Sequence, residues 1–317
     1  MLHRYCHTCL TYQENRYTDT LEIGQIPILD LLFLKNPLYL LASTYGLIDA
    51  TFPVARFAQD RMRERLHNDP SSKQPGVSPF PPTQPDLLSK FIQAKTDHPD
   101  FMNDSLVTTM AVSMAFAGSE TTAISLSAVF YFLLKNPACM QNVLNELDSK
   151  ARKGYFKDDK YGVVTYAESQ GLAYLDASIK EAFRLHPAAG LPLERVVPPQ
   201  GAEIAGEFVK GGTIVGCSAW VIHRRKDIFG EDVEDFRPER WLVGQGHVVA
   251  DEAEREREEK RIKEMGSVML HFGMGSRTCI GKNISLLEIY KLVPTFLRRF
   301  EVRFSFPFAG SCGILIY

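Results

Sequence analysis

The chain has 317 residues, of which 45% are hydrophobic, so it can bury a sizeable core as one large domain or two ordinary ones. Its 36 basic and 38 acidic residues give a formal net charge of -2, which argues against the basic surface of nucleic-acid-binding proteins, and we expect no nucleic-acid partner. The six cysteines are scattered, which excludes the dense spacing of a disulfide-stapled secreted fold and favours a reducing compartment.

The N-terminal quarter contains no segment that we expect to span a membrane. The apolar stretch 26–57 is broken by charged residues and a proline, and its charge-free piece is too short to cross a bilayer, so packed or membrane-touching helices fit it better. Residues 70–85 contain six prolines and predict a long surface loop. The Cys-His-Thr-Cys run at 6–9 has the spacing of half a zinc site, but no second pair follows, and we interpret it as incidental.

Helices are predicted to dominate up to about residue 186. The polar residues at 103–105 can cap a helix of about 30 residues that runs to Leu134, before Asn136-Pro137 ends it. Polar residues at its middle divide it into apolar halves shorter than a membrane span, so we expect a buried helix in a soluble core. Amphipathic spacing predicts two further helices, over 137–153 and 172–185.

The pattern changes after residue 200. Residues 202–221, with a glycine pair at 211–212 between apolar pieces, predict a small hairpin sheet. The mixed-charge block 251–264 predicts a solvated helix or loop without chemistry of its own. A last helix is predicted over 284–300, and its expected core positions are Leu287, Leu292, Val293, Phe296 and Leu297. The sequence therefore predicts a mainly α protein with a minor β element.

The strongest chemical signal is the run 272–281, Phe-Gly-Met-Gly-Ser-Arg-Thr-Cys-Ile-Gly, which places Cys279 at the start of the last helix. Glycines permit tight positive-φ turns beside a flat cofactor, and the first amides and the dipole of a helix stabilise a thiolate, which can bind iron. A buried, inert cysteine after a glycine-rich turn explains the same residues, and the run alone does not decide between the two.

This run resembles the cysteine-ligand loop of the cytochrome P450 family, whose fixed positions are filled by Phe272, Gly273, Gly275, Arg277, Cys279 and Gly281. The resemblance implies that Cys279 is the proximal ligand of a haem iron, that Phe272 and Gly273 lie at the cofactor, and that Arg277 pairs with a haem propionate. It covers about residues 25–303 and is nearest to fungal microsomal members of the pisatin demethylase-like type. It implies one partial domain over 1–317 with the cytochrome P450 fold, lacking the N-terminal anchor, the N-terminal sheet and the C-terminal strands.

The middle of the long helix also matches this family, at Gly118, Glu120 and Thr121. Glycine inside a helix destabilises it by about 0.5–1 kcal/mol relative to alanine. One explanation for a glycine at this position is that a ligand approaches the backbone closely. By resemblance, Glu120 and Thr121 are the catalytic pair that supplies the protons consumed in oxygen activation. The alternative is that both side chains cap or hydrogen-bond to the helix itself.

Two further segments match the family in the same order. Glu181 and Arg184 share one helix face, and alone they would be an ordinary surface ion pair. By resemblance, they join Arg240 in a buried network that supports folding and the haem loop, where loss of one member would strand a desolvated charge. Arg195 resembles an arginine that pairs with a haem propionate, and its alternative is a solvated strand residue.

Two histidines remain outside the matched roles. We expect His223 to be packed and hydrogen-bonded rather than a metal ligand. His271, beside the cysteine run, could reach a propionate or have a plain surface role.

The resemblance implies a monooxygenase that uses the iron of heme b to insert one oxygen atom from O2 into a small apolar organic substrate, in fungal secondary metabolism. Electrons would come from NADPH through a cytochrome P450 reductase. The implied location is the cytoplasmic face of the endoplasmic reticulum membrane, without a recognisable anchor in this chain. Two alternatives are a catalytically silent fragment with weak or no haem binding, and a membrane-associated interaction protein that uses residues 26–57.

Overall fold

A computed structural model describes residues 56–57, 59–60, 86–157, 162–244, 251–305 and 313–316. The predictions for residues 6–9, 26–55 and 70–85 lie outside the described residues. The chain divides into two compact units, the first formed by Met1–Ala117 with Ser305–Gly313 and the second by Gly118–Phe304 with Ile314–Tyr317.

In the first unit, α4 (Leu87–Asp97) packs near the start of α5 (Asp104–Lys135). The carboxylate of Asp86 accepts the backbone N–H of Ser89 at 2.8 Å, which caps α4 at its N-terminus. Met102 and Val107 are buried and form a small hydrophobic cluster with side chains of α4.

The long helix predicted over 103–134 is α5, and its 32 residues confirm the expected length. Among the described residues, it is the one helix long and apolar enough to cross a membrane by length and composition, a test that core helices of soluble proteins also pass. Val129 and Leu133 in its C-terminal half are fully buried, whereas residues 116–121 are exposed. The expectation of a buried helix therefore holds for the C-terminal half of α5 but not for the middle.

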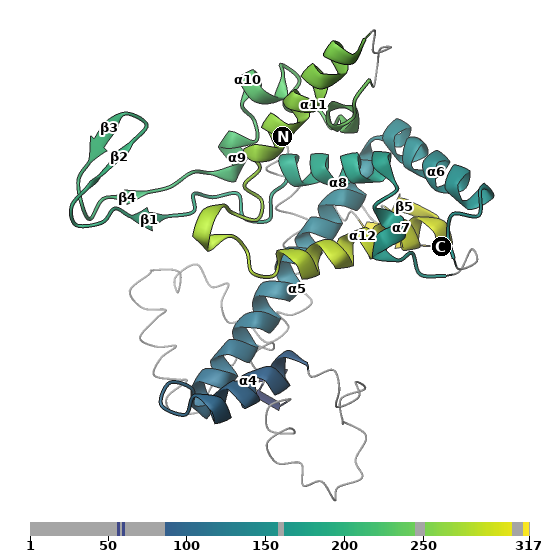
Figure 1. The fold of residues 1–317 in the computed structure, drawn as a ribbon. Helices are drawn as coiled ribbons and strands as arrows, with labels where there is room; N and C mark the ends of the chain where they lie inside the picture. The colour runs from purple at the N-terminus through teal and green to yellow at the C-terminus, as the bar shows by residue number, and fades with distance from the viewer. Residues whose placement is uncertain are drawn as a thin grey trace, which may run out of the picture. The chain divides into compact units, whose positions relative to one another are not determined.

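The core of the second unit lies between helices. Besides the C-terminal half of α5, it includes α6 (Pro137–Arg152), α8 (Ala173–Leu185) and α12 (Lys282–Arg299), with the short α7 (Tyr166–Ser169) against α12 (Figure 1). The buried side chains shared by these elements include Val129, Leu133, Val143, Leu147, Leu175, Ile179, Phe183, Ile289, Val293 and Leu297. The helices predicted over 137–153 and 172–185 are thus confirmed.

The N-termini of α7 and α8 are capped in different ways. Thr165 and Glu168 form a capping box at α7, in which each side chain bonds the backbone of the other. Leu172 at the start of α8 has no capping side chain, so the carboxylate of Glu146 in α6 accepts the N–H groups of Tyr174 and Leu175, both at 3.0 Å. This contact joins α6 to α8.

The buried face of α12 differs from the expected one. Leu287 and Leu292, predicted to lie in the core, are 43% and 39% exposed. Ile289 and Val293 are fully buried, and with Leu297 they follow the four-residue spacing of one helix face. The prediction was therefore right for Val293 and Leu297 and wrong for the other two leucines.

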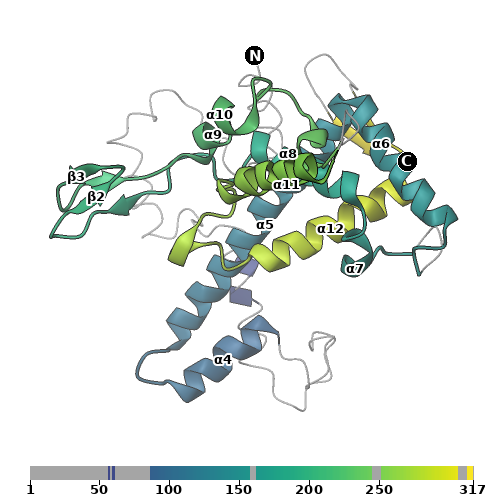
Figure 2. The ribbon, with the colours of Figure 1, turned by 45° about the horizontal axis from the view of Figure 1, so that its top comes forward.

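The β region consists of two hairpins rather than one. β1 (Arg195–Val196) pairs antiparallel with β4 (Ile214–Val215), and β2 (Ala202–Ile204) pairs antiparallel with β3 (Glu207–Val209). In both ribbon views, the hairpins extend away from the helices of their unit (Figures 1 and 2). The predicted 211–212 turn joins β3 to β4, but these two strands are not partners.

The tight turn lies instead at Ala205-Gly206, between β2 and β3. Both residues have positive φ, +53° and +84°, as the preferred two-residue hairpin turn requires. The expected sheet also extends too far, because Ser218 caps a short helix, α9 (Ala219–Ile222), by accepting the N–H of Val221.

The remaining elements are α10 (Lys226–Phe229), η2 (Pro238–Trp241), α11 (Glu252–Ser267), η3 (Gly275–Arg277), β5 (Val302–Ser305) and β6 (Gly313–Ile316). The mixed-charge block is the exposed helix α11, capped by Asp251, and only Met265 of this helix is buried. Met265 packs with Ala177, Phe229, Val233 and Trp241 in a second small core. Described strands are few and pair two by two, which confirms a mainly α fold with a minor β element.

Candidate functional site

Cys279 lies between η3 and the first residue of α12, in a loop that hydrogen bonds hold closed. The N–H of Cys279 donates to the carbonyl oxygen of Phe272 at 2.8 Å. Gly273 and Gly275 have φ of +69° and +70°, a conformation that favours glycine and lets the chain turn within a few residues. The thiol-bearing residue is exposed at the head of the helix, where the first amides have no intrahelical acceptors.

Exposed apolar residues lie close to Cys279 in the chain. Ile280, the next residue, is 91% exposed, and Met274 is also exposed. Phe272 is half-buried and packs edge-on against Phe183 of α8, with ring centroids 5.9 Å apart. Exposed apolar side chains before and after Cys279 favour a partner with an apolar surface over water alone.

The middle of α5 is tied to the helix that follows the cysteine. Thr122 donates from its hydroxyl to the hydroxyl of Ser285 in α12 at 3.1 Å. Glu120 and Thr121, the predicted proton-supplying pair, are exposed next to this contact. A Cβ added at Gly118 would meet nothing within 4 Å, so the backbone there borders open space.

The structure brings Glu181, Arg184 and Arg240 together. Arg184 binds the Glu181 carboxylate with two bonds, from Nε at 2.9 Å and from Nη2 at 2.8 Å, and Arg240 donates from Nε to the same carboxylate at 2.8 Å. All three side chains are fully buried. Such a carboxylate between two guanidiniums is stable only because each charge has partners.

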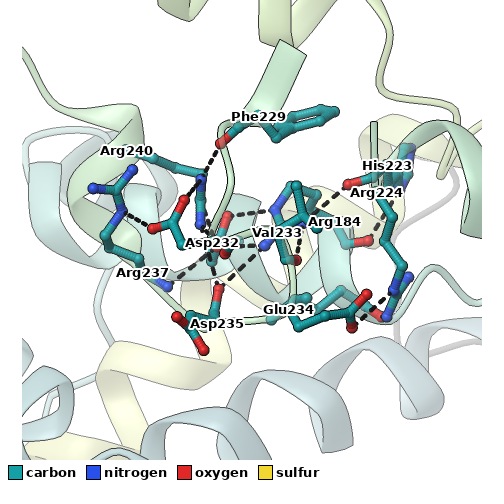
Figure 3. A network of polar contacts seen from close by, with 12 residues as sticks. Arg184, His223, Arg224, Phe229, Asp232, Val233, Glu234, Asp235, Arg237 and Arg240 are labelled. Carbon is teal, nitrogen blue, oxygen red and sulfur yellow. Dashed lines mark hydrogen bonds and ion pairs between the residues drawn. The ribbon is translucent and has the colours of Figure 1, made fainter. Parts of the chain in front are cut away.

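Backbone carbonyls complete the network around the two arginines (Figure 3). Arg184 also donates to the carbonyls of His223 and Val233, at 2.9 and 2.7 Å, and Arg240 donates to the carbonyl of Phe229 and to the Asp232 carboxylate. These bonds fasten the segment 229–235 onto α8 and η2.

Sequence reasoning missed Asp232 and, bound to the central carboxylate itself, Trp241. Its indole N–H donates to Oε2 of Glu181 at 2.9 Å, and the backbone N–H of Arg237 adds a bond to Oε1 at 3.1 Å. The signal that could have found it is the tryptophan next to Arg240, since a buried indole N–H usually has an acceptor.

The two arginines predicted to pair with propionates, Arg195 and Arg277, are both exposed. Arg195 lies in β1 and donates from Nη1 to the carbonyl of Glu194 at 2.6 Å. The chain just before β1 reaches the cysteine loop, because a Cβ at Gly273 would lie 3.6 Å from Cδ1 of Leu193. The structure therefore places the segment that carries Arg195 beside the loop that carries Arg277.

His223 is packed and hydrogen-bonded, as predicted. Burial is the main cause that lowers its pKa to about 4; the hydrogen bond to the backbone of Arg184 opposes this shift, and the charges of Arg184 and Arg224 add to it. His271 stacks on Phe183 at 4.7 Å, and burial likewise lowers its pKa, to about 3. The Nδ1 atom of His271 is buried without a hydrogen-bond partner among the described residues.

Comparison with known proteins identifies the chain. The family model described as Cytochrome P450 matches residues 29–306, so the chain belongs to the cytochrome P450 family. It is 41% identical over 285 residues to the cytochrome P450 monooxygenase cicH of Emericella nidulans, covering 89% of this chain and 51% of that protein. A pisatin demethylase of Fusarium vanettenii is 41% identical over 186 residues, 59% of this chain and 32% of the relative.

A cytochrome P450 monooxygenase of Aspergillus terreus is 39% identical over 280 residues, which is 88% of this chain and 52% of the relative. The chain thus spans about half the length of the relatives that it matches over most of its own length.

The residues present fit the haem that the family implies. Cys279 is a free, exposed cysteine just before the first turn of α12, so a bound group can reach it. Gly273 and Gly275 have no side chains, and the exposed apolar Ile280 directly follows Cys279 in the chain. The unpartnered Nδ1 of His271 lies in the residue that precedes Phe272, so a polar atom of the loop is left for a bound group or a water to satisfy.

Proposed function

We propose that the chain is the haem-binding part of a monooxygenase that inserts one oxygen atom from O2 into a small apolar organic substrate. The observation that carries the proposal is the exposed Cys279 in a closed glycine loop just before α12, together with the bond from Thr122 of α5, next to Gly118–Thr121, to Ser285 of that helix. When bound, heme b supplies the redox-active iron for oxygen activation.

The side chains of this chain would bind the haem, hold it in place and supply protons for the reaction. Cys279 binds the iron as a thiolate through Sγ, and Arg195 and Arg277 bind propionates through their guanidinium groups. Glu120 and Thr121 would supply protons through their carboxyl and hydroxyl groups, beside the open backbone at Gly118. Glu181, Arg184 and Arg240 hold α8, η2 and the segment 229–235 in one arrangement.

The finer expectations follow from the relatives. Names such as pisatin demethylase and several fungal cytochrome P450 monooxygenases support a role in fungal secondary metabolism, with electrons from NADPH through a cytochrome P450 reductase. The same kinship supports a place at the cytoplasmic face of the endoplasmic reticulum membrane.

The test is a reduced carbon monoxide spectrum of the purified, haem-supplied chain. We expect the strongly red-shifted Soret band of a thiolate ligand, and we expect Cys279→Ala to abolish it. Cys217→Ala is the matched control, because Cys217 is another exposed free cysteine in the same unit, and it should leave the band unchanged.

A band that survives Cys279→Ala would refute the ligand assignment. Failure of the unmodified chain to bind haem at all would instead favour the alternative of a catalytically silent helical protein.

A further inference from the structure

His223 lies between two parts of the candidate site and hydrogen-bonds to both. Its Nδ1 atom is 3.1 Å from the carbonyl oxygen of Arg184 at the end of α8, and its Nε2 atom accepts the backbone N–H of Leu270 at 2.8 Å. Arg184 returns a bond, since its Nη1 donates to the carbonyl of His223. The imidazole therefore joins the helix of the buried ion pair to the segment that leads into the cysteine loop.

The two partners fix the protonation of the ring. A backbone N–H can only donate, so Nε2 carries no proton, and a carbonyl oxygen can only accept, so Nδ1 carries one. The side chain is fully buried, and this burial holds the pKa of His223 well below neutrality. The neutral Nδ1–H form, which can make both bonds, is thus the form present at neutral pH.

From Leu270, backbone hydrogen bonds continue to the cysteine. The N–H of Gly273 donates to the carbonyl of Leu270 at 2.8 Å, and the N–H of Cys279 donates to the carbonyl of Phe272 at 2.8 Å. The two bonds share one peptide group, because the carbonyl of Phe272 and the N–H of Gly273 belong to the same peptide bond. A short path of bonds therefore runs from the buried ion network through the imidazole to the backbone of Cys279.

We propose that His223 is a positioning residue, which fixes the segment before Phe272 against α8 and thereby sets where Cys279 presents its sulfur. The part of this inference that concerns iron rests on the proposed function, whereas the part that concerns the loop does not. If His223 only filled space, any side chain of similar volume could replace it. A positioning residue requires an acceptor at the place of Nε2.

Two polar substitutions separate these requirements. In His223→Asn, the amide nitrogen is two bonds from Cβ, as Nδ1 is in histidine, so it can still donate to the carbonyl of Arg184. The shorter side chain has no atom that reaches the N–H of Leu270. In His223→Gln, the terminal oxygen is as many bonds from Cβ as Nε2 is, so it can still accept from Leu270. Glu146→Ala is a control, because it removes the cap from the opposite end of α8 and touches no part of the loop.

The first measurement is amide hydrogen exchange of the full, haem-free chain. We expect His223→Asn to raise exchange in the peptide 268–281 by about tenfold, the order of factor that one lost hydrogen bond gives. His223→Gln should keep the protection of the unmodified chain. Glu146→Ala should raise exchange near Tyr174 and leave 268–281 unchanged.

The second measurement is the reduced carbon monoxide spectrum with haem supplied. His223→Asn should convert part of the thiolate band to the less shifted band of a protonated or detached thiol, and His223→Gln should retain the thiolate band. Absence of any thiolate band in the unmodified chain would reject the proposed function, while the exchange experiment would still decide the role of His223.

The inference is overturned if both variants protect 268–281 as well as the unmodified chain does. It is also overturned if His223→Asn raises exchange equally in α6 and α12, because His223 would then be a general core residue with no particular effect on the loop.

Discussion

At the scale of single residues, Trp241 is the least expected part of the buried network. Its indole N–H is a neutral donor to a carboxylate that already binds two guanidiniums. We predict that Trp241→Phe lowers the free energy of unfolding by at least about 1.5–3 kcal/mol, the range for a hydrogen bond to a charged group, because the indole donor is lost together with part of the buried ring. Urea unfolding followed by far-UV circular dichroism would measure it.

Trp220 provides the matched control, since the chain has only two tryptophans. It is 44% exposed, and Arg224 lies over its ring at 3.7 Å. Trp220→Phe should change the free energy of unfolding by about 0.5 kcal/mol or less, as is usual for exposed positions. Equal losses in the two variants would mean that the indole bond to Glu181 contributes nothing.

Motif spacing could predict which charged residues form the buried ion network, but not which backbone groups bind them. The three-residue separation of Glu181 and Arg184 put both on one face of α8, and their mutual bonds follow from that geometry. The bonds of Arg184 to carbonyls of His223 and Val233 come from residues about 40 and 50 positions away. Such contacts depend on tertiary packing, which the local pattern does not contain.

At the scale of elements, α12 shows how a helix can be predicted while its buried face is partly mistaken. Ile289 is fully buried in the main core, whereas Leu287 is 43% exposed. We predict that Ile289→Ala costs about 2–5 kcal/mol of stability through lost burial and an unfilled cavity. Leu287→Ala should cost less, about 1 kcal/mol, because nearly half of this residue is already in contact with water.

Thermal or urea unfolding of the two variants under one set of conditions measures this difference. A larger cost at Leu287 would show that the sequence-based prediction of the buried face was right and that α12 is rotated in solution relative to the structure.

The β elements explain a different kind of error. The glycines at 211–212 predict a hairpin turn, yet the closing turn is Ala205-Gly206, where alanine adopts a positive φ. An alanine gives no local signal for that conformation, because non-glycine residues rarely adopt it. A Cβ at Gly211 would lie 2.4 Å from the carbonyl oxygen of Pro199, so this glycine reflects close chain approach.

At the scale of the whole molecule, the sequence could predict a mainly helical protein and its order of elements, because long periodic segments carry their own signal. It could not predict the division into two compact units or the path of bonds that meets at His223. Both depend on which distant segments meet. The same buried histidine also links the stability of the whole fold to pH.

Burial lowers the pKa of His223 from 6.5 to about 4. As the pH falls below 6.5, His223 becomes protonated in the unfolded chain but stays neutral in the folded chain. The free energy of unfolding therefore keeps its full contribution from His223 above pH 6.5 and declines as the pH falls towards about 4. One pH unit corresponds to about 1.36 kcal/mol, so at pH 5 this residue should lower the free energy of unfolding by about 2 kcal/mol.

His223→Gln cannot titrate, and it isolates this contribution from those of the carboxylates and of His271. We predict that the loss of unfolding free energy between pH 7.5 and pH 5 is about 2 kcal/mol smaller in His223→Gln than in the unmodified chain, in paired urea titrations. The difference between the two pH values removes any constant cost of the substitution itself. Equal losses in the two proteins would mean that His223 is protonated in the folded state at pH 5, which is incompatible with an Nε2 that accepts from Leu270.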